Sequence, residues 1–223
     1  MLALIFITIA HSVQPVVAAG NGLVAAPPPE LVKPASEVAS TWISVLGDCL
    51  EDGRPGAFSV VDRSDEGTTT SRVNKDVGSI RELEPAAVVL GLGALEMSSD
   101  EEPAAFRRRL TEVVSSLRAG NGPLVLLVGI VGPTLSQLEW SAEEDVAARQ
   151  GAIDQRARSW NEALERVAAS DDGVWRVDLA WPSDSSSRKR LTRGGWALTD
   201  RAHARVGAVI CEELLKKLKN HSQ

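Results

Sequence analysis

An alternation of short apolar runs with longer stretches of helical periodicity is the feature that most constrains this chain. Each apolar run is short enough for a buried strand and is closed by glycine, proline or a polar loop. Between the runs, apolar residues recur at the spacing of an amphipathic helix. We expect strands at residues 42–46, 58–61, 86–92, 124–131 and 174–179, and helices at residues 79–83, 102–118, 143–169 and from 199 to 218.

This order of elements predicts an α/β fold, a three-layer α/β/α sandwich with a mostly parallel sheet of the flavodoxin-like kind. In open parallel sheets the reactive site lies at the carboxyl ends of the strands. The loops expected at that edge are residues 47–50, 64–70 and 93–97. The chemistry of the protein is therefore sought in these three loops.

The N-terminal residues resemble an export signal. Residues 1–10 are apolar and uncharged, and the small residues Val17-Ala18-Ala19 follow. The apolar run is too short to span a bilayer, so the pattern predicts a signal peptide at residues 1–19 of a secreted or periplasmic protein. No lysine or arginine precedes the run, so a mis-assigned start codon in a cytoplasmic protein, or a partly buried N-terminal segment, stays open. A proline-rich linker is expected at residues 20–37 and the folded domain at residues 38–219.

The composition restricts the classes of partner. With 43% hydrophobic and 24% charged residues, the chain resembles a soluble globular protein. Its formal net charge of -6 disfavours binding to nucleic acid or to an anionic lipid surface. We therefore expect no nucleic-acid partner and no membrane span once the signal has been removed.

The chain has two cysteines, Cys49 and Cys211. Cys49 stands at the end of an expected strand, whereas Cys211 falls inside the expected C-terminal helix. These positions do not suit the geometry of a disulfide, so we expect the two thiols to stay unpaired. Cys49 would then be free to act as a nucleophile.

Four segments with chemical potential follow one another along the chain. A strand followed by a turn at a helix N-terminus exposes a nucleophile and stabilises its anion, which is the setting expected for the first segment. Each segment alone is a weak signal, but their fixed order is specific. They are Gly47-Asp48-Cys49-Leu50, residues 60–70, residues 90–96, and Gly194-Gly195-Trp196-Ala197-Leu198-Thr199.

Over residues 40 to 218 the chain resembles the SGNH, or GDSL, hydrolases, a family of esterases, lipases and carbohydrate acetylesterases. The resemblance implies a serine nucleophile in the first block, an oxyanion-hole glycine in the second and an asparagine donor in the third. The fourth block of the family carries the aspartate and histidine of the triad. The resemblance also implies the SGNH variant of the flavodoxin-like sandwich, and a ligand that is a small ester or an acylated sugar.

Transferred to this chain, the family pattern is degenerate. Gly67 holds the oxyanion position, or only permits the conformation of its loop. Four positions are substituted: Cys49 stands for the serine, Leu95 for the asparagine, Gly194 for the aspartate and Ala197 for the histidine. An acyl-transfer nucleophile needs a base, and that base must later protonate the leaving group, which alanine cannot do.

Two hypotheses follow for the function. The first is a pseudoenzyme, weakly active or inactive, that serves as a binding or scaffold module. The second is a carboxylic-ester or acyl-group hydrolase that uses Cys49, with a base and donors from outside the four blocks. His203 lies on the expected last helix with Asp200 three residues earlier, and could form a relocated acid–base pair, but a packing role is favoured. No cofactor is expected, and no residues show the spacing of a metal site.

Overall fold

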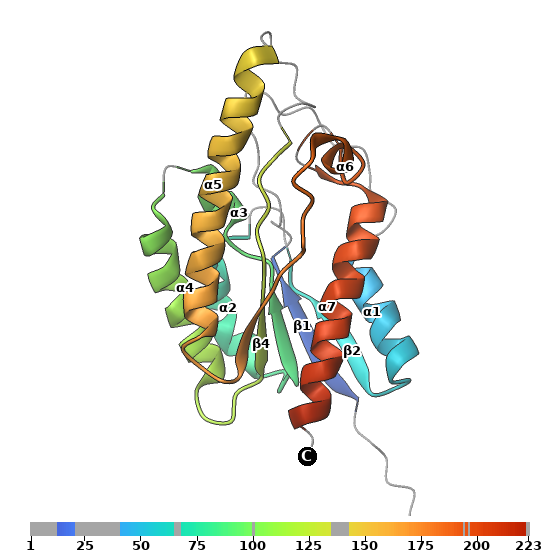
Figure 1. Ribbon diagram of the computed structural model, residues 1–223. Helices are drawn as coiled ribbons and strands as arrows, with labels where there is room; N and C mark the ends of the chain where they lie inside the picture. Colours follow the sequence, from blue (N-terminus) through green and yellow to red (C-terminus); the bar gives the residue numbers. More distant parts are fainter. Residues whose placement is uncertain are drawn as a thin grey trace, which may run out of the picture.

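The computed structural model describes residues 13–20, 41–64, 68–99, 101–134, 143–193, 195 and 197–221. Within these residues a five-stranded sheet runs in the order β2-β1-β3-β4-β5, with all neighbouring strands parallel (Figure 1). This is the order expected of a flavodoxin-like sheet. The strands are β1 (Gln14–Ala19), β2 (Phe58–Asp62), β3 (Ala87–Leu90), β4 (Leu124–Val128) and β5 (Val174–Val177).

Helices cover both faces of the sheet. One face carries the paired helices α1 and α7, and the other carries α2, α4 and α5, with α2 and α5 on either side of α4 (Figure 1). The predicted three-layer α/β/α sandwich is confirmed. The helices are α1 (Trp42–Gly53), α2 (Thr70–Arg81), α3 (Ala94–Ser98), α4 (Pro103–Arg118), α5 (Glu143–Ala168), α6 (Ser185–Lys189) and α7 (Asp200–His221).

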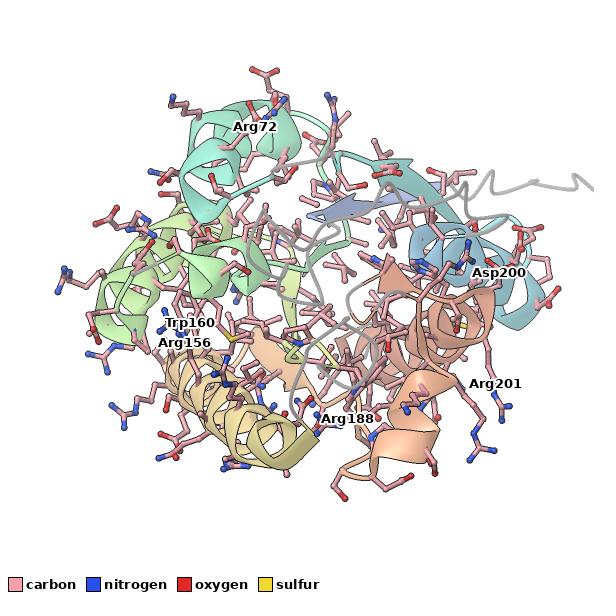
Figure 2. The ribbon with its side chains drawn as sticks, turned by 90° about the horizontal axis from the view of Figure 1, so that it is seen from above. Arg72, Arg156, Trp160, Arg188, Asp200 and Arg201 are labelled. Atoms are coloured by element: carbon pink, nitrogen blue, oxygen red, sulfur yellow. A yellow bond between two sulfur atoms is a disulfide. The ribbon has the colours of Figure 1, made fainter. Side chains whose placement is uncertain are left out.

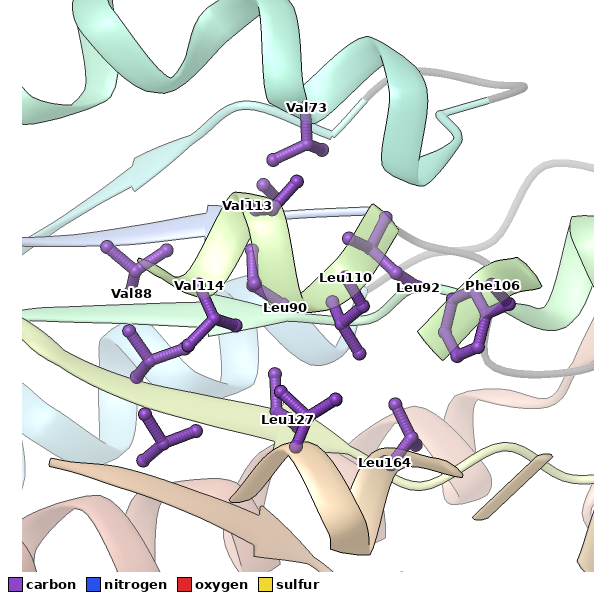
Figure 3. Close-up of a cluster of buried hydrophobic side chains, with 14 of the residues drawn as sticks. Val73, Val88, Leu90, Leu92, Phe106, Leu110, Val113, Val114, Leu127 and Leu164 are labelled. Carbon is purple, nitrogen blue, oxygen red and sulfur yellow. The ribbon is translucent and has the colours of Figure 1, made fainter. Parts of the chain in front are cut away.

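The two halves of the core follow from the alternation of side chains along the strands. In β1, Val17 and Ala19 pack with the α2, α4 and α5 layer, while Val16 and Ala18 pack with the α1 and α7 layer. Figure 3 shows the first half, in which Phe106 lies at one end of a cluster of valines and leucines. Because both faces of β3 and β4 are buried, these central strands are continuously apolar, whereas the edge strands β2 and β5 are buried only in part.

The segment predicted as the end of a signal peptide is the middle of the sheet. Gln14–Ala19 pairs with β2 on one side and with β3 on the other, and its last four residues are buried. The boundary expected at residue 38 is therefore wrong, because β1 belongs to the folded domain. A short run of small apolar residues suits both a signal peptide and a buried parallel strand. Of the three explanations for the N-terminal pattern, the structure favours a partly buried N-terminal segment. Residues 1–12 and 21–40, which include most of the expected linker, lie outside the described residues.

The run expected as the first strand, residues 42–46, is instead the first turn of α1. Thr41 and Ser44 form a reciprocal capping box, in which each side chain bonds the other residue's backbone N–H. The apolar face continues past Gly47, because Trp42, Leu46 and Leu50 lie four residues apart and are all buried. The expectation of a strand was wrong because the apolar run alone suits either element, and the cap at Thr41 decides for a helix.

Helices α1 and α7 lie unusually close together at Gly207. A Cβ atom at this position would lie 2.6 Å from Cβ of Val45 and 2.7 Å from the carbonyl oxygen of Trp42. Only glycine fits such an approach of one helix to the backbone of another. Gly207 therefore sets the spacing at which α1 and α7 pack. Among the described residues, no helix is both long and apolar enough to cross a membrane.

Candidate functional site at the carboxyl edge of the sheet

The carboxyl ends of β1 and β3 meet where the strand order reverses, the place at which such sheets bind ligands. The backbone N–H of Gly91 donates to the carbonyl oxygen of Ala19 at 3.0 Å. Gly20 has φ +83°, and a Cβ on it would lie 2.5 Å from the Gly91 carbonyl oxygen. Glycine at residue 20 is thus required both by its left-handed backbone and by the closeness of Gly91.

A buried carboxylate joins the second and third segments. Oε1 of Glu96, in α3, accepts hydrogen bonds from the backbone N–H of Thr70 at 2.6 Å and from its hydroxyl at 2.8 Å. Both residues are buried. The other oxygen, Oε2, has no hydrogen-bond partner within the described part of the chain. Glu96 therefore acts as a clamp between α3 and the start of α2.

The fourth segment forms a small antiparallel hairpin of β6 (Thr192–Arg193) and β7 (Ala197–Leu198). The backbone N–H of Thr134, in the loop after β4, donates to the carbonyl oxygen of Gly195 in the hairpin turn at 2.6 Å. The Thr192 hydroxyl donates to the carbonyl oxygen of Arg188 at 3.1 Å. These bonds hold the hairpin at the carboxyl end of β4.

A partly buried ion pair fixes the segment that leads into this hairpin. The Arg188 guanidinium makes two bonds to the Asp154 carboxylate of α5, at 2.7 and 2.9 Å. Its Nε also donates to the carbonyl oxygen of Pro182 at 2.7 Å. A bidentate pair of this kind is geometrically specific. It ties α6 to α5 and so positions the start of β6.

The structure brings two predicted site positions to this edge. Leu95 lies on α3 and Ala197 on β7, and both side chains are half-buried. Gly67 and Gly194 lie outside the described residues. At these two positions the edge thus presents apolar side chains.

Cys49 is not at this edge. It lies in the third turn of α1 and forms a disulfide with Cys211 of α7, with the two Cα atoms 6.3 Å apart. The expectation of two unpaired thiols was wrong because Cys49 was placed at a strand end, whereas two adjacent helices bring the residues together. A sulfur held in a disulfide is not a nucleophile, so the hypothesis of a hydrolase using Cys49 is contradicted.

The residues that follow β1 in the sequence are Gly20-Asn21-Gly22-Leu23. This tetrapeptide, and not residues 47–50, directly follows a strand of the sheet, which is the setting expected above for the first segment. It was missed because it was assigned to the signal and linker. The available signal was a glycine and a leucine at the family spacing directly after a small apolar run. Asn21, Gly22 and Leu23 lie outside the described residues.

His203 serves in packing between α7 and α1. Its Nδ1 accepts a hydrogen bond from the backbone N–H of Trp42 at 3.1 Å. Burial lowers the pKa of His203 below its usual value, and Arg193 lowers it further, while Asp200 opposes the shift. The imidazole is thus held neutral and satisfies a backbone donor in the first turn of α1.

A polar pocket of about 300 Å³ opens beside the ends of β1 and β2. Its charged lining residues are Asp62, Arg63, Arg72 and Asp76, and Ala19 and Thr68 also line it. Among the described residues no three His, Cys, Asp or Glu side chains gather as a metal site would require. The pocket therefore offers hydrogen-bonding groups and charges of both signs to a ligand.

No family model matches the sequence, and no curated protein matches it either. Solved structures do match the fold. TesA has 19% identity and a TM-score of 0.66, over 92% of this chain and 99% of its own. A GDSL-like lipase from Bacteroides thetaiotaomicron has 16% identity and a TM-score of 0.62, over 92% and 89%. Est24, a carbohydrate acetylesterase from Sinorhizobium meliloti, has 14% identity and a TM-score of 0.62, over 91% and 99%.

These matches extend over about nine tenths of this chain. At identities below one in five they establish the architecture and not the chemistry. The parallel sheet, its strand order and its two helical layers agree with them. The chain therefore has the fold of the SGNH, or GDSL, hydrolases.

Proposed function

We propose that this protein is a pseudoenzyme of the SGNH fold, a binding or scaffold module that retains the cleft at the carboxyl edge of the sheet without the means to hydrolyse esters. Its ligand would be a small ester or an acylated sugar. The observation that carries the proposal is the pair of apolar side chains, Leu95 and Ala197, at an edge where ester hydrolysis needs a donor and a base.

The position of the nucleophile supports the same conclusion. After β1 the sequence offers Gly22 at the serine position of the family block, and glycine has no side chain to form a covalent intermediate. The chain has two cysteines, and both are joined in the disulfide between α1 and α7. A serine-type or thiol-type mechanism would therefore lack its first reactant.

The supply of general bases is equally restricted. The sequence contains three histidines, of which His11 and His221 lie near the ends of the chain. Nδ1 of the third, His203, is engaged with the Trp42 backbone. In subtilisin, disabling the catalytic triad costs about a millionfold in turnover, and the oxyanion hole with substrate binding retains a rate roughly 10³ to 10⁴ above that in water. We expect at most such a residual rate here.

We further propose that the protein works in an oxidising compartment, and is secreted or periplasmic. The Cys49–Cys211 disulfide supports this, because reducing compartments keep most thiols unpaired. Removal of residues 1–19 as a signal peptide would delete β1 from the centre of the sheet. The proposal of export therefore depends on the disulfide and not on cleavage after Ala19.

Hydrolysis of p-nitrophenyl acetate by the purified full-length chain tests the pseudoenzyme proposal. We expect no burst, and a rate of hydrolysis no higher than that of the double variant Leu95→Ala/Ala197→Gly. That variant alters the same edge without adding a reactive group. Saturable turnover by the unmodified protein, lost in that variant, would overturn the proposal.

A reconstruction separates a lost catalytic set from a lost cleft. Combining Gly22→Ser, Leu95→Asn, Gly194→Asp and Ala197→His restores the family's reacting groups at the positions assigned above. We expect saturable hydrolysis in this variant, and none when Gly22→Ser is omitted from the set.

Binding of triacetin to the unmodified protein, followed by NMR, tests whether the cleft itself is retained. We expect shifts in the signals of residues at the carboxyl edge of the sheet. The absence of any shift would contradict a retained ester-binding cleft.

A further inference from the structure

Three arginines line a pocket formed by residues of α6, its flanking segments and the first turns of α7. The pocket has a volume of about 390 Å³, which is within the range of small-molecule sites. Arg190 comes from the end of α6, and Arg201 and Arg205 come from the first turns of α7. Figure 1 shows α6 beside the start of α7, at the same edge as the carboxyl ends of the strands.

The remaining lining of the pocket divides into an apolar floor and a hydroxyl. Leu191 is buried and Pro182 is half-buried, while Ser187 adds a side-chain oxygen. No acidic side chain is among the described residues that line this pocket. In a chain with a net charge of -6, a pocket lined by three guanidinium groups is a local reversal of charge.

The arginines on α7 are placed against the electrostatics of their own helix. Cations are disfavoured near a helix N-terminus, and like charges four residues apart repel each other. Arg201 and Arg205 have this spacing at the N-terminal end of α7. At the opposite end of the helix, Glu212 and Lys216 have the same spacing with opposite charges. A bound anion would remove the repulsion at the N-terminal end.

The acidic residues closest in sequence to these arginines, and the one that pairs with Arg188, do not line the pocket. Asp184 caps α6 by accepting from the Ser187 backbone at 2.8 Å, and the hydrogen bond from Ser186 is the main cause that lowers its pKa to about 2. Asp154 pairs with Arg188. Asp200 is exposed in the first turn of α7. Arg201 forms no hydrogen bond or ion pair with any other described residue, and Figure 2 shows it on the α7 side of the molecule. Arg205 donates through Nη2 to the carbonyl oxygen of Ala180 at 2.8 Å, which leaves its other guanidinium donors for a ligand.

We infer that this pocket binds a small organic phosphate. Its phosphoryl group lies between the guanidinium groups of Arg190, Arg201 and Arg205, and its organic part lies against Pro182 and Leu191. Three guanidiniums offer more donors than one carboxylate can accept, whereas a phosphate monoester carries nearly two charges and three strong acceptor oxygens. This site is separate from the proposed ester cleft, and the inference does not depend on loss of hydrolysis.

Titration of the isotopically labelled full-length chain with phenylphosphonate, followed by NMR, tests this inference. We expect saturable shifts confined to residues 182–191 and 201–205. Arg201→Gln should weaken binding roughly tenfold, the effect of one charged hydrogen bond. Arg108→Gln is the matched control, because Arg108 is an exposed arginine on α4 and its loss changes the net charge equally. Its affinity should equal that of the unmodified protein.

Two further arms make the test decisive. Arg190→Gln removes the guanidinium from α6 and should weaken binding by a similar factor, since each arginine contributes its own contacts. Inorganic phosphate should bind more weakly than phenylphosphonate because it cannot contact the apolar floor. Shifts that never saturate, an equal loss in Arg108→Gln, or equal affinities for the two anions would each overturn the assignment.

Discussion

Two regions of the molecule can be compared: the contact between α1 and α7, and the carboxyl edge of the sheet. In each region, residues of the expected active site have a different role from the one a hydrolase would need. Cys49, the expected nucleophile, lies between helices and forms a disulfide with Cys211. At the edge, Leu95 and Ala197 present apolar side chains, and the proposed loss of hydrolysis rests on them. The place of a motif in the fold, and not its sequence alone, therefore decides its chemistry.

The α1–α7 pair and the carboxyl edge are also stabilised by different interactions. The α1–α7 pair depends on a covalent bond and on a glycine that permits close approach. The carboxyl edge depends on buried hydrogen bonds, such as those from Thr70 to Glu96. Substitutions in the two regions should therefore differ in their response to reducing agent, and the predictions below use this difference.

Removal of the disulfide should have the largest effect. Cys49 and Cys211 are 162 residues apart, so their bond restricts a long loop of the unfolded chain. We expect the variant Cys49→Ala/Cys211→Ala to lose about 2–4 kcal/mol in free energy of unfolding. Urea unfolding with and without reductant measures it: reductant should destabilise the unmodified protein and leave the variant unchanged. Equal midpoints for the oxidised and reduced unmodified protein would contradict the prediction.

Gly207→Ala should destabilise the same helix pair by overpacking. The added methyl would meet the backbone of Trp42, so we expect a loss of about 1–3 kcal/mol. Gly78→Ala is the matched control, because Gly78 lies in α2 and a Cβ there would meet nothing within 4 Å. Alanine should stabilise that helix by roughly 0.5–1 kcal/mol. Thermal unfolding of both variants gives the comparison, and shifts of the same sign would count against it.

At the carboxyl edge, Glu96→Ala should cost about 1–2 kcal/mol, because it leaves the buried backbone N–H and hydroxyl of Thr70 without their acceptor. Glu96→Gln keeps an acceptor oxygen and should cost less than half as much. Denaturant unfolding measures both variants, and the loss should be the same under reducing conditions. Equal losses in the two variants would show that the clamp does not act through Thr70.

His203 should give the smallest effect, through pH. Its pKa in the folded protein is lowered from the usual value of 6.5, so the unfolded chain binds the proton more readily. Its contribution is therefore complete above about pH 6.5 and is lost as the pH falls toward the lowered pKa. His203→Gln should reduce the difference in unfolding free energy between about pH 7.5 and about pH 5.5. An unchanged difference would exclude His203 as its source.

Much of the fold was predictable from the sequence because parallel strands are buried on both faces. The runs at β3 and β4 are apolar throughout and those at β2 and β5 are mostly apolar, and the helices α4 and α5 were predicted to within about a residue at each end. The last helix was also found from Thr199, whose hydroxyl accepts from the Ala202 backbone at 3.3 Å. Local patterns sufficed wherever the core imposes a single periodicity.

The first strand and the site were not predictable in the same way. β1 is short and rich in small residues, and its identity follows from pairing with β2 and β3, which no local pattern reports. The disulfide likewise depends on the packing of α1 against α7, and its two cysteines are 162 residues apart in the sequence. Glu96 falls within the third of the four segments, but its role as a clamp follows only from the contact with Thr70, which is 26 residues away in the sequence.

The most direct test of the central claim is the number of free thiols in the full-length protein. Alkylation in denaturant followed by mass spectrometry counts them, before and after reduction. We predict no alkylated cysteine before reduction and two after it, because Cys49 and Cys211 are joined in the folded protein. Two alkylated cysteines without reduction would contradict the account and return Cys49 as a free thiol.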